Sequence, residues 1–157
     1  MLENNDKYFE VLNDIKKTLI TTRNKIVESA NKDLVDYVHS LKGKCKIGIF
    51  ADLIYCCSPA LDSQVDLKQF DYVWVSFITH VRKNEEPAFQ IVEQDLQTSP
   101  NNIMFVDDTS INIENAKKRG WNTCQAFGYE LDKIKQSVEQ FLTQDLNYNI
   151  NNTFRRL

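Results

Sequence analysis

The chain has 157 residues, a net charge of −3 and 26% charged residues. That length fits one domain with a hydrophobic core of its own. The net charge is slightly negative, and the sequence has no basic stripe with interleaved aromatic residues. These features argue against a protein that binds nucleic acid by electrostatic attraction. The segment Met1–Glu10 is polar and acidic, unlike a signal peptide, and no stretch is apolar over the length of a membrane span. We therefore predict a cytoplasmic protein that binds neither nucleic acid nor membranes.

The cysteines give no sign of a disulfide framework or a zinc site. Cys45 and Cys124 lie within apolar runs, while Cys56 and Cys57 are adjacent, and none belongs to a Cys-x-x-Cys pair. Adjacent cysteines rarely bridge each other. We expect reduced thiols, as in an intracellular protein.

Two helices are expected at the start of the chain. Residues 6–29 place apolar side chains three, four or seven positions apart, which is typical of one face of an amphipathic helix. A second helix, Lys32–Leu41, follows the capping residue Asn31 and ends before Gly43.

Strands alternate with helices over the rest of the chain. Apolar runs predict strands at Cys45–Phe50, Phe70–Phe77, Ile103–Val106 and Asn122–Ala126. The expected helices are Glu86–Leu96, the segment between Ser110 and Gly120, and Tyr129–Leu146. This alternation indicates an α/β fold with a mostly parallel sheet. Residues 147–157 show little packing pattern, and we expect them to fray.

The stretch Ile103–Gly120 holds the strongest functional signal. Its buried strand ends in two adjacent carboxylates, Asp107 and Asp108, and a helix follows. Such a turn lies at the carboxyl end of a parallel strand, where open α/β sheets bind ligands. Two neighbouring carboxylates are costly to pack unless a cation shares them, and their hard oxygens suit Mg²⁺. The alternative is an acidic turn that only caps the next helix.

Two segments resemble motifs of the haloacid-dehalogenase-like (HAD-like) hydrolases, in the subgroup with a helical cap. KNEEPAF at 83–89 resembles the third motif, and FVDDTSINIENAKKRGWNTCQAF at 105–127 resembles the fourth. The fourth motif is matched by Asp107, Asp108, Asn112, Ala116, Gly120 and Trp121. The third is matched only by Lys83 and Phe89, because the family's Lys-Pro-x-Pro is replaced by Lys-Asn-Glu-Glu. The resemblance spans roughly residues 30–145.

The resemblance implies a Rossmann-like three-layer α/β/α fold with a mostly parallel sheet. Residues 1–30 would be a remnant of the helical cap, residues 31–146 the HAD-like core, and residues 147–157 a flexible tail. In the family, the residue at Lys83 steadies the phosphorylated nucleophile, and those at Asp107 and Asp108 hold Mg²⁺. The crevice beside them would include Ala51, Asp52, Ser76 and Asn112.

Two departures from the family bear on activity. The hydroxyl residue of the second motif falls at Ala51, which has none. The first motif, Asp-x-Asp, supplies the nucleophile and the general acid, but no Asp-x-Asp occurs in the sequence. Asp52 ends an apolar run, yet Ile54 follows two residues later. The first strand of the family's core thus has no counterpart, and the chain would begin within the cap.

That strand is the central one in the family's sheet. The strands at Cys45 and Ile103 would flank its place, with those at Phe70 and Asn122 outside them. A gap would leave two rows of unpaired backbone groups, each costing about 1–3 kcal/mol. We therefore expect that the flanking strands close on each other, that another polypeptide supplies the strand, or that the chain self-associates through its open edges.

Three functional hypotheses remain. The first is a HAD-like domain that cannot catalyse alone and serves as an interaction module or is a remnant. The second is part of a Mg²⁺-dependent phosphatase that another polypeptide completes, with a small phosphorylated ligand. The third is unrelated chemistry on the same scaffold. We favour the first, with Lys83 either an anion contact or an ordinary solvated side chain beside Glu85 and Glu86, and with His80 lacking a nucleophile to serve.

Overall fold

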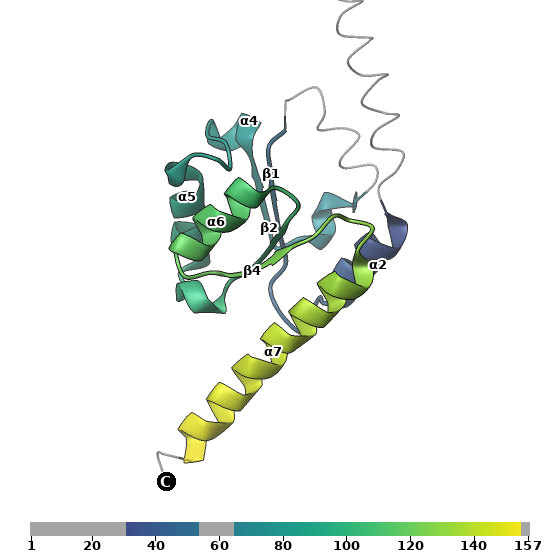
Figure 1. Cartoon of the computed structure of the whole chain (residues 1–157), viewed down its shortest axis with the longest axis vertical. Coiled ribbons are helices and arrows are strands. Elements are labelled where there is room, and N and C mark those ends of the chain that lie inside the picture. The colour runs from purple at the N-terminus through teal and green to yellow at the C-terminus, as the bar shows by residue number, and fades with distance from the viewer. Residues whose placement is uncertain (1–30, 54–64, 155–157) are drawn as a thin grey trace, which may run out of the picture. The chain divides into compact units, whose positions relative to one another are not determined.

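The computed structural model describes residues 31–53 and 65–154, with side chains described as far as residue 143. The chain divides into two compact units, residues 1–77 and 78–157. The described elements are α2 (Lys32–Ser40), β1 (Gly48–Ala51), η2 (Leu67–Gln69), β2 (Tyr72–Val75), α4 (Ser76–Thr79), α5 (Glu86–Leu96), η3 (Pro100–Asn102), β3 (Met104–Asp107), α6 (Ser110–Lys118), β4 (Asn122–Gln125) and α7 (Leu131–Phe154) (Figure 1). The helix expected over residues 6–29, and Cys56 and Cys57, lie outside the described residues.

Helix α2 of the first unit begins at Lys32, as the sequence predicts, and ends at Ser40, one residue before the predicted Leu41, which is its C-cap. The side-chain oxygen of Asn31 accepts hydrogen bonds from the backbone N–H groups of Asp33 (3.0 Å) and Leu34 (3.3 Å). These bonds satisfy two of the donors that a helix leaves open at its first turn. Gly43 follows the helix with a left-handed φ of 86°, a conformation that favours glycine.

Strands β1 and β2 form a parallel pair in which Gly48 faces Tyr72 and Ala51 faces Val75. The expected strand at Cys45–Phe50 is real but starts later, because Cys45 still belongs to the turn after α2, where its N–H bonds the carbonyl of Leu41. The expected strand at Phe70–Phe77 is too long at both ends, since its last residues turn into the short helix α4.

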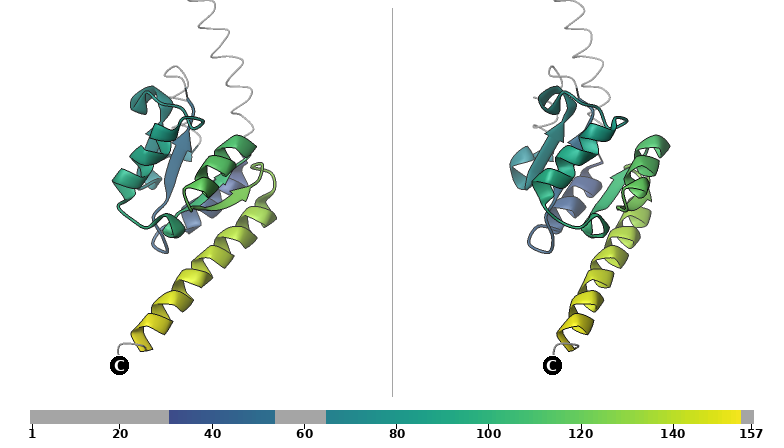
Figure 2. Two further views of the ribbon diagram at one scale, coloured as in Figure 1. Left: turned by 60° about the vertical axis from the view of Figure 1, so that its left-hand side comes forward. Right: turned by 90° about the vertical axis from the view of Figure 1, so that its left-hand side faces the viewer.

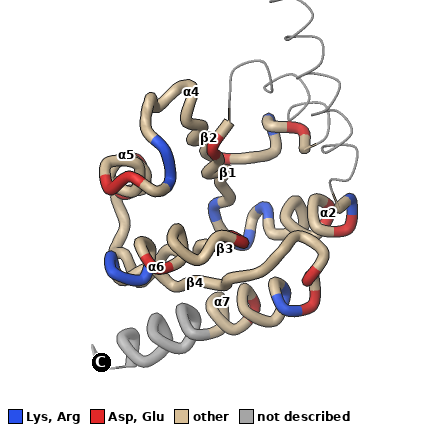
Figure 3. The backbone as a smooth tube through the Cα atoms, turned by 45° about the horizontal axis from the view of Figure 1, so that its top comes forward, with Lys and Arg blue, Asp and Glu red and all other residues tan. Residues whose placement is uncertain are grey.

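Strands β3 and β4 form a second parallel pair, in the second unit, and α6 connects them. Both α6 and α7 pack on this pair, and Figures 1 and 3 show them on opposite sides of β4. The last turn of α6 carries Lys117 and Lys118, where cations suit the helix dipole. The helix is followed by Gly120, whose φ is 84°. The expected pairing of the Cys45 strand with the Phe70 strand, and of the Ile103 strand with the Asn122 strand, is therefore confirmed.

Three aromatic rings form the centre of the second unit. They come from α5, from β3 and from the residue just before β4. Phe89 is fully buried, and its ring meets those of Phe105 (centroids 6.1 Å apart) and Trp121 (5.2 Å) edge to face. Phe105 and Trp121 meet in the same way at 5.9 Å. Each such pair contributes about 0.5–1.5 kcal/mol beyond the area that it buries. The cluster fixes α5 against the strand that leads to the acidic turn.

A polar contact ties the same elements together from outside the core. Arg119 donates from Nε and Nη2 to the two carboxylate oxygens of Glu93, at 2.8 and 2.5 Å. The indole N–H of Trp121 donates to the same carboxylate at 2.9 Å. The Arg119 bond, the largest effect, holds the pKa of Glu93 below its usual range against the opposing effect of burial. A two-point bond of this kind specifies geometry as well as adding stability.

The alternation of strands and helices with parallel pairing confirms the expected α/β fold. Helix α5 has the bounds that the sequence predicts, whereas α7 continues to Phe154, past Leu146, because no glycine or proline interrupts that stretch. Figure 2 shows α7 as one unbroken helix. Among the described residues, no helix has both the length and the apolar character needed to cross a membrane.

Gly48 offers a direct test of the β1–β2 packing. A Cβ at this position would lie 2.7 Å from Cζ3 of Trp74, a buried ring that stacks on Tyr72. Gly48→Ala is expected to lower the free energy of unfolding by about 1–3 kcal/mol, measured by urea denaturation. In a Trp74→Leu background the clashing ring is absent, so the same change should cost less. Equal costs in the two backgrounds would contradict this packing.

Candidate functional site

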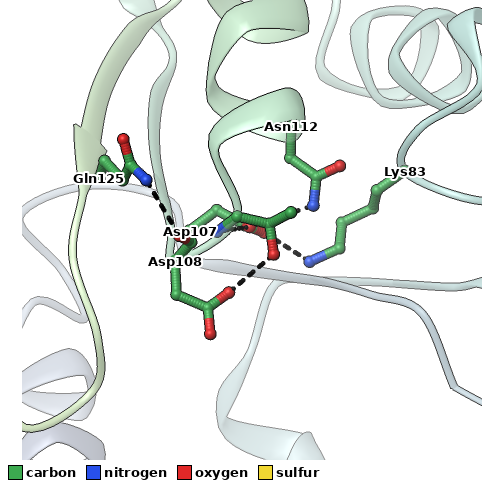
Figure 4. A network of polar contacts seen from close by, with 6 residues as sticks. Lys83, Asp107, Asp108, Asn112 and Gln125 are labelled. Carbon is green, nitrogen blue, oxygen red and sulfur yellow. Dashed lines mark hydrogen bonds and ion pairs between the residues drawn. The ribbon is translucent and has the colours of Figure 1, made fainter.

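The acidic turn lies where the sequence predicts it, at the carboxyl end of β3. Asp107 is the last residue of that strand and pairs with Gln125, the last residue of β4. Its backbone carbonyl accepts a hydrogen bond from the N–H of Ala126 at 3.1 Å. The two parallel strands thus end at the same level. The side chains of Asp107, Asp108 and Gln125 lie close together at the carboxyl ends of these strands (Figure 4).

Asp107 is a buried carboxylate with a partner on each oxygen. Its Oδ1 accepts hydrogen bonds from the backbone N–H of Thr109 (2.9 Å) and from the side-chain amide of Asn112 (3.1 Å). Its Oδ2 accepts one from the ammonium of Lys83 at 2.5 Å. Asn112 is itself buried, on the first turn of α6. Lys83, Asp107 and Asn112 are therefore in direct contact.

The electrostatics of Asp107 follow from these contacts. Burial works to raise the pKa of the Asp107 carboxyl, but the hydrogen bonds from Lys83, Thr109 and Asn112 together outweigh it, so the pKa is lowered. The carboxyl is therefore ionised at neutral pH. An ionised group this deeply buried is stable only when it is paired and hydrogen-bonded.

Lys83 is not an ordinary solvated side chain. Only 15% of its side chain is exposed, against 4% for that of Asp107. The interpretation that leaves its ammonium in solvent beside Glu85 and Glu86 is wrong. The residue precedes α5, and the backbone N–H of Glu85 bonds the carbonyl of Arg82 in the turn that leads into that helix.

Asp108 has a different environment from its neighbour. It is exposed, and its Oδ1 accepts a hydrogen bond from the hydroxyl of Thr109 at 3.0 Å. The side-chain amide of Gln125 donates to the backbone carbonyl of Asp108 at 3.2 Å. Gln125 was not among the predicted site residues, and its contact with the acidic turn follows from the strand register, in which it pairs with Asp107.

The idea that the acidic turn simply caps α6 is not supported by the contacts. Thr109 is the N-cap residue, and it makes no side-chain capping bond. Asp107 instead bonds the N–H of Thr109 itself and reaches Asn112 through the side chain. The turn is held by a network around Asp107 rather than by a conventional cap.

The remaining crevice candidates belong to the first unit. Ala51 is the last residue of β1, and Asp52 after it is exposed. The hydroxyl of Ser76 accepts a hydrogen bond from the N–H of Leu53 (2.9 Å) and donates one to its carbonyl (3.1 Å). It therefore fastens the chain after β1 to the end of β2. His80, which follows α4, is exposed and has a left-handed φ of 59°.

The residues around Asp107 do not by themselves fit a magnesium site. Among the side chains that the structure describes, in residues 31–53 and 65–143, no group of three or more His, Cys, Asp or Glu is placed to hold a metal ion. Both oxygens of Asp107 already accept N–H donors, and one of these donors is a cation. Asp108 keeps an exposed carboxylate, which is a single protein ligand, so water would have to supply most of the oxygen ligands of a Mg²⁺ ion there.

The burial of Lys83 with Asp107 makes a prediction about stability. Asp107→Asn leaves a buried ammonium uncompensated, so we expect a loss of about 3 kcal/mol in the free energy of unfolding near neutral pH. Asp108→Asn is the matched control, and because Asp108 is exposed it should change stability by no more than about 0.5 kcal/mol. Equal effects of the two substitutions in urea denaturation would contradict the described network.

The same contacts predict a pH dependence. Because the folded-state pKa of Asp107 lies below the unfolded value of about 3.9, its stabilising effect is complete above that value and is lost as the pH falls through the folded pKa. The stability difference between the wild type and Asp107→Asn should therefore shrink on acidification below about pH 4. A difference that grows in acid would show that the carboxylate is not stabilised by folding.

Comparisons with known proteins point to one fold. No protein-family model matches the sequence, and no curated protein sequence matches it. A HAD family enzyme from Bacteroides thetaiotaomicron, solved as an aspartate-to-alanine mutant with magnesium and inorganic phosphate, is similar in structure. It has a TM-score of 0.55 and 20% identity over 59% of this chain and 51% of its own. A predicted HAD-like family hydrolase from Porphyromonas gingivalis gives a TM-score of 0.50 and 22% identity over 57% and 47%.

An uncharacterized protein from Corynebacterium glutamicum has a similar structure as well, with a TM-score of 0.55 and 20% identity over 70% of this chain and 79% of its own. The chain thus spans about half the length of the two HAD proteins it matches. Its parallel strand pairs and the acidic turn after β3 agree with that likeness. The chain has the HAD-like α/β fold.

Proposed function

We propose that this chain is a HAD-like domain that does not hydrolyse phosphate esters by itself. The observation that carries the proposal is that a polar cluster for holding charge is present, while the sequence contains no Asp-x-Asp to supply a nucleophile and an acid. Hydrolysis through a covalent intermediate requires a nucleophile that attacks phosphorus. Groups that only neutralise charge have no step to assist without one.

The charges of the cluster support this proposal. Lys83 and Asp107 neutralise each other, and the exposed carboxylate of Asp108 adds a negative charge. The net charge of these three side chains is negative, so this end of β3 does not attract a phosphate group. Ala51, at the end of β1, offers no hydroxyl for a phosphoryl oxygen, and the hydroxyl of Ser76 is already engaged with Leu53. The proposed role is therefore that of a binding or interaction module.

A second candidate is part of a Mg²⁺-dependent phosphatase that another polypeptide completes. The observation in its favour is that Lys83, Asp107 and Asn112 are gathered at one strand end, which a purely structural remnant does not need. The similar enzyme from Bacteroides thetaiotaomicron was solved with magnesium and inorganic phosphate. In this candidate the partner supplies the Asp-x-Asp strand and the metal ligands that the described residues lack, and a small phosphorylated ligand is the substrate.

We extend the proposal to partners and location. A parallel sheet is stable when its strands are paired and covered, so either candidate includes strand addition from a second copy or a partner chain. The compartment proposed is the cytoplasm, in keeping with cysteines that are free at both described positions, Cys45 and Cys124.

Catalysis is tested with a phosphate monoester. The purified chain is expected to hydrolyse p-nitrophenyl phosphate in Mg²⁺ no faster than its Asp107→Asn variant, because neither protein contains an Asp-x-Asp to supply the nucleophile and the general acid. The measurement is the release of nitrophenolate, with Asp108→Asn as a second reference. A Mg²⁺-dependent rate in the wild type that Asp107→Asn abolishes would overturn the proposal.

The two candidates are separated by the DNA upstream of the Met1 codon in the source organism. If it encodes an apolar strand that ends in Asp-x-Asp, in frame or in a neighbouring short reading frame, the assay is repeated with both parts together. Activity of the combined parts would support the split phosphatase and replace the first candidate.

A further inference from the structure

Asp107 has a complete set of partners within the second unit. Its Oδ1 accepts two N–H donors, from Thr109 and Asn112, and its Oδ2 accepts the ammonium of Lys83 at 2.5 Å. The Lys83 and Asp107 side chains are 15% and 4% exposed, so water contributes little to either. Figure 4 shows Lys83 and Asn112 approaching the carboxylate. The carboxylate already has a cation.

We propose that the ammonium of Lys83 is the resident cation of Asp107, so that this chain assembles its acidic turn without a divalent metal. A divalent ion that approached Oδ2 would meet a positive charge already in hydrogen-bond contact with that atom, and the two cations would repel each other. To bind, the ion would have to displace Lys83 from a largely buried position.

The neighbourhood supports a fixed position for Lys83. Its segment leads directly into α5, and α5 is held by the buried ring of Phe89 and by the two-point bond between Glu93 and Arg119. Displacement of the ammonium therefore has to move a residue that adjoins a firmly packed helix. Asp108 keeps its carboxylate exposed and bonded to the hydroxyl of Thr109, so it offers an incoming ion one protein ligand in place of the occupied carboxylate of Asp107.

The role that follows for Lys83 is that of a positioning residue. It joins the segment before α5 to the turn between β3 and α6, and it sets the direction of the Asp107 carboxylate. This inference does not depend on whether the chain catalyses a reaction, because it concerns only how the turn is held. It can therefore fail or succeed independently of the proposed function.

The experiment uses the full chain and measures thermal unfolding by circular dichroism, in EDTA and in excess MgCl₂. The variants are Lys83→Met, Asp107→Asn, the two combined, and the control Lys46→Met. Lys46 also pairs with an aspartate, Asp71, but its side chain is 73% exposed. Wild type and Lys46→Met should melt at the same temperature with and without Mg²⁺. Lys83→Met should melt lower, by about 5 °C or more.

The most informative comparison is whether Mg²⁺ can replace the lost ammonium in Lys83→Met. Once Lys83 is removed, Asp107 has no counter-charge, so Mg²⁺ should raise the melting temperature of Lys83→Met but not that of the double variant. A Mg²⁺ response in the wild type that Asp107→Asn abolishes would overturn the proposal. So would a Lys83→Met protein as stable as Lys46→Met, or one that Mg²⁺ leaves unchanged.

A second measurement keeps the test valid if Lys83→Met does not fold. Binding of Mn²⁺ to the wild type is followed by the electron paramagnetic resonance signal of the free ion. We expect no loss of that signal that depends on Asp107, so wild type and Asp107→Asn should give the same titration. A stoichiometric loss in the wild type alone would show that a metal, not Lys83, is the resident cation.

Discussion

The ion pair between Lys83 and Asp107 is the interaction on which the described end of the sheet depends. Asp107 ends a buried strand, so its carboxylate leaves water when the chain folds, and that desolvation has to be compensated. The compensation comes from three donors on three different segments: the lysine before α5, the turn itself, and the first turn of α6. The carboxylate therefore joins its own turn and the start of α6 to the segment of Lys83, which lies 24 residues earlier in the sequence.

The rest of the second unit holds those donors in place. Phe89, Phe105 and Trp121 lock α5 to the strand pair, and the bond between Glu93 and Arg119 repeats that connection nearer the surface. Because Lys83 lies in the short turn that leads into α5, the packing of this helix limits where its ammonium can lie. The aromatic packing that fixes α5 therefore also affects the position of the charged Lys83 side chain.

The polar cluster of the second unit positions and neutralises charge, whereas the sequence contains no Asp-x-Asp. The carboxylate of Asp107 has the ammonium of Lys83 and two N–H donors as its partners. A cluster whose own cation already balances its acid can remain stable without a ligand.

Much of the fold could be predicted from local patterns. The Asn31 cap, the bounds of α5 and the stop at Gly120 follow from chemistry within a few residues, and the acidic turn follows from a buried strand that ends in two aspartates. The ends of β1 and β2 were less predictable, because apolar residues there belong to a turn and to α4 rather than to strands. Local pattern does not distinguish those alternatives.

The candidate site was predictable in its members but not in its contacts. Sequence spacing brings Asp107 and Asn112 to one turn, but the burial of Lys83 depends on the packing of α5, and the engagement of Ser76 with Leu53 depends on how two strand ends meet. Gln125 could be identified only once the register of β3 and β4 was known. These contacts arise from tertiary structure, which residue spacing alone does not determine.

The most direct test of this account is a crystal structure of the chain grown with Mn²⁺, with anomalous scattering used to locate the metal. The account predicts the Nζ of Lys83 within hydrogen-bond distance of Oδ2 of Asp107, and no anomalous peak at that carboxylate. A peak that bridges Asp107 and Asp108, with Lys83 displaced, would contradict it.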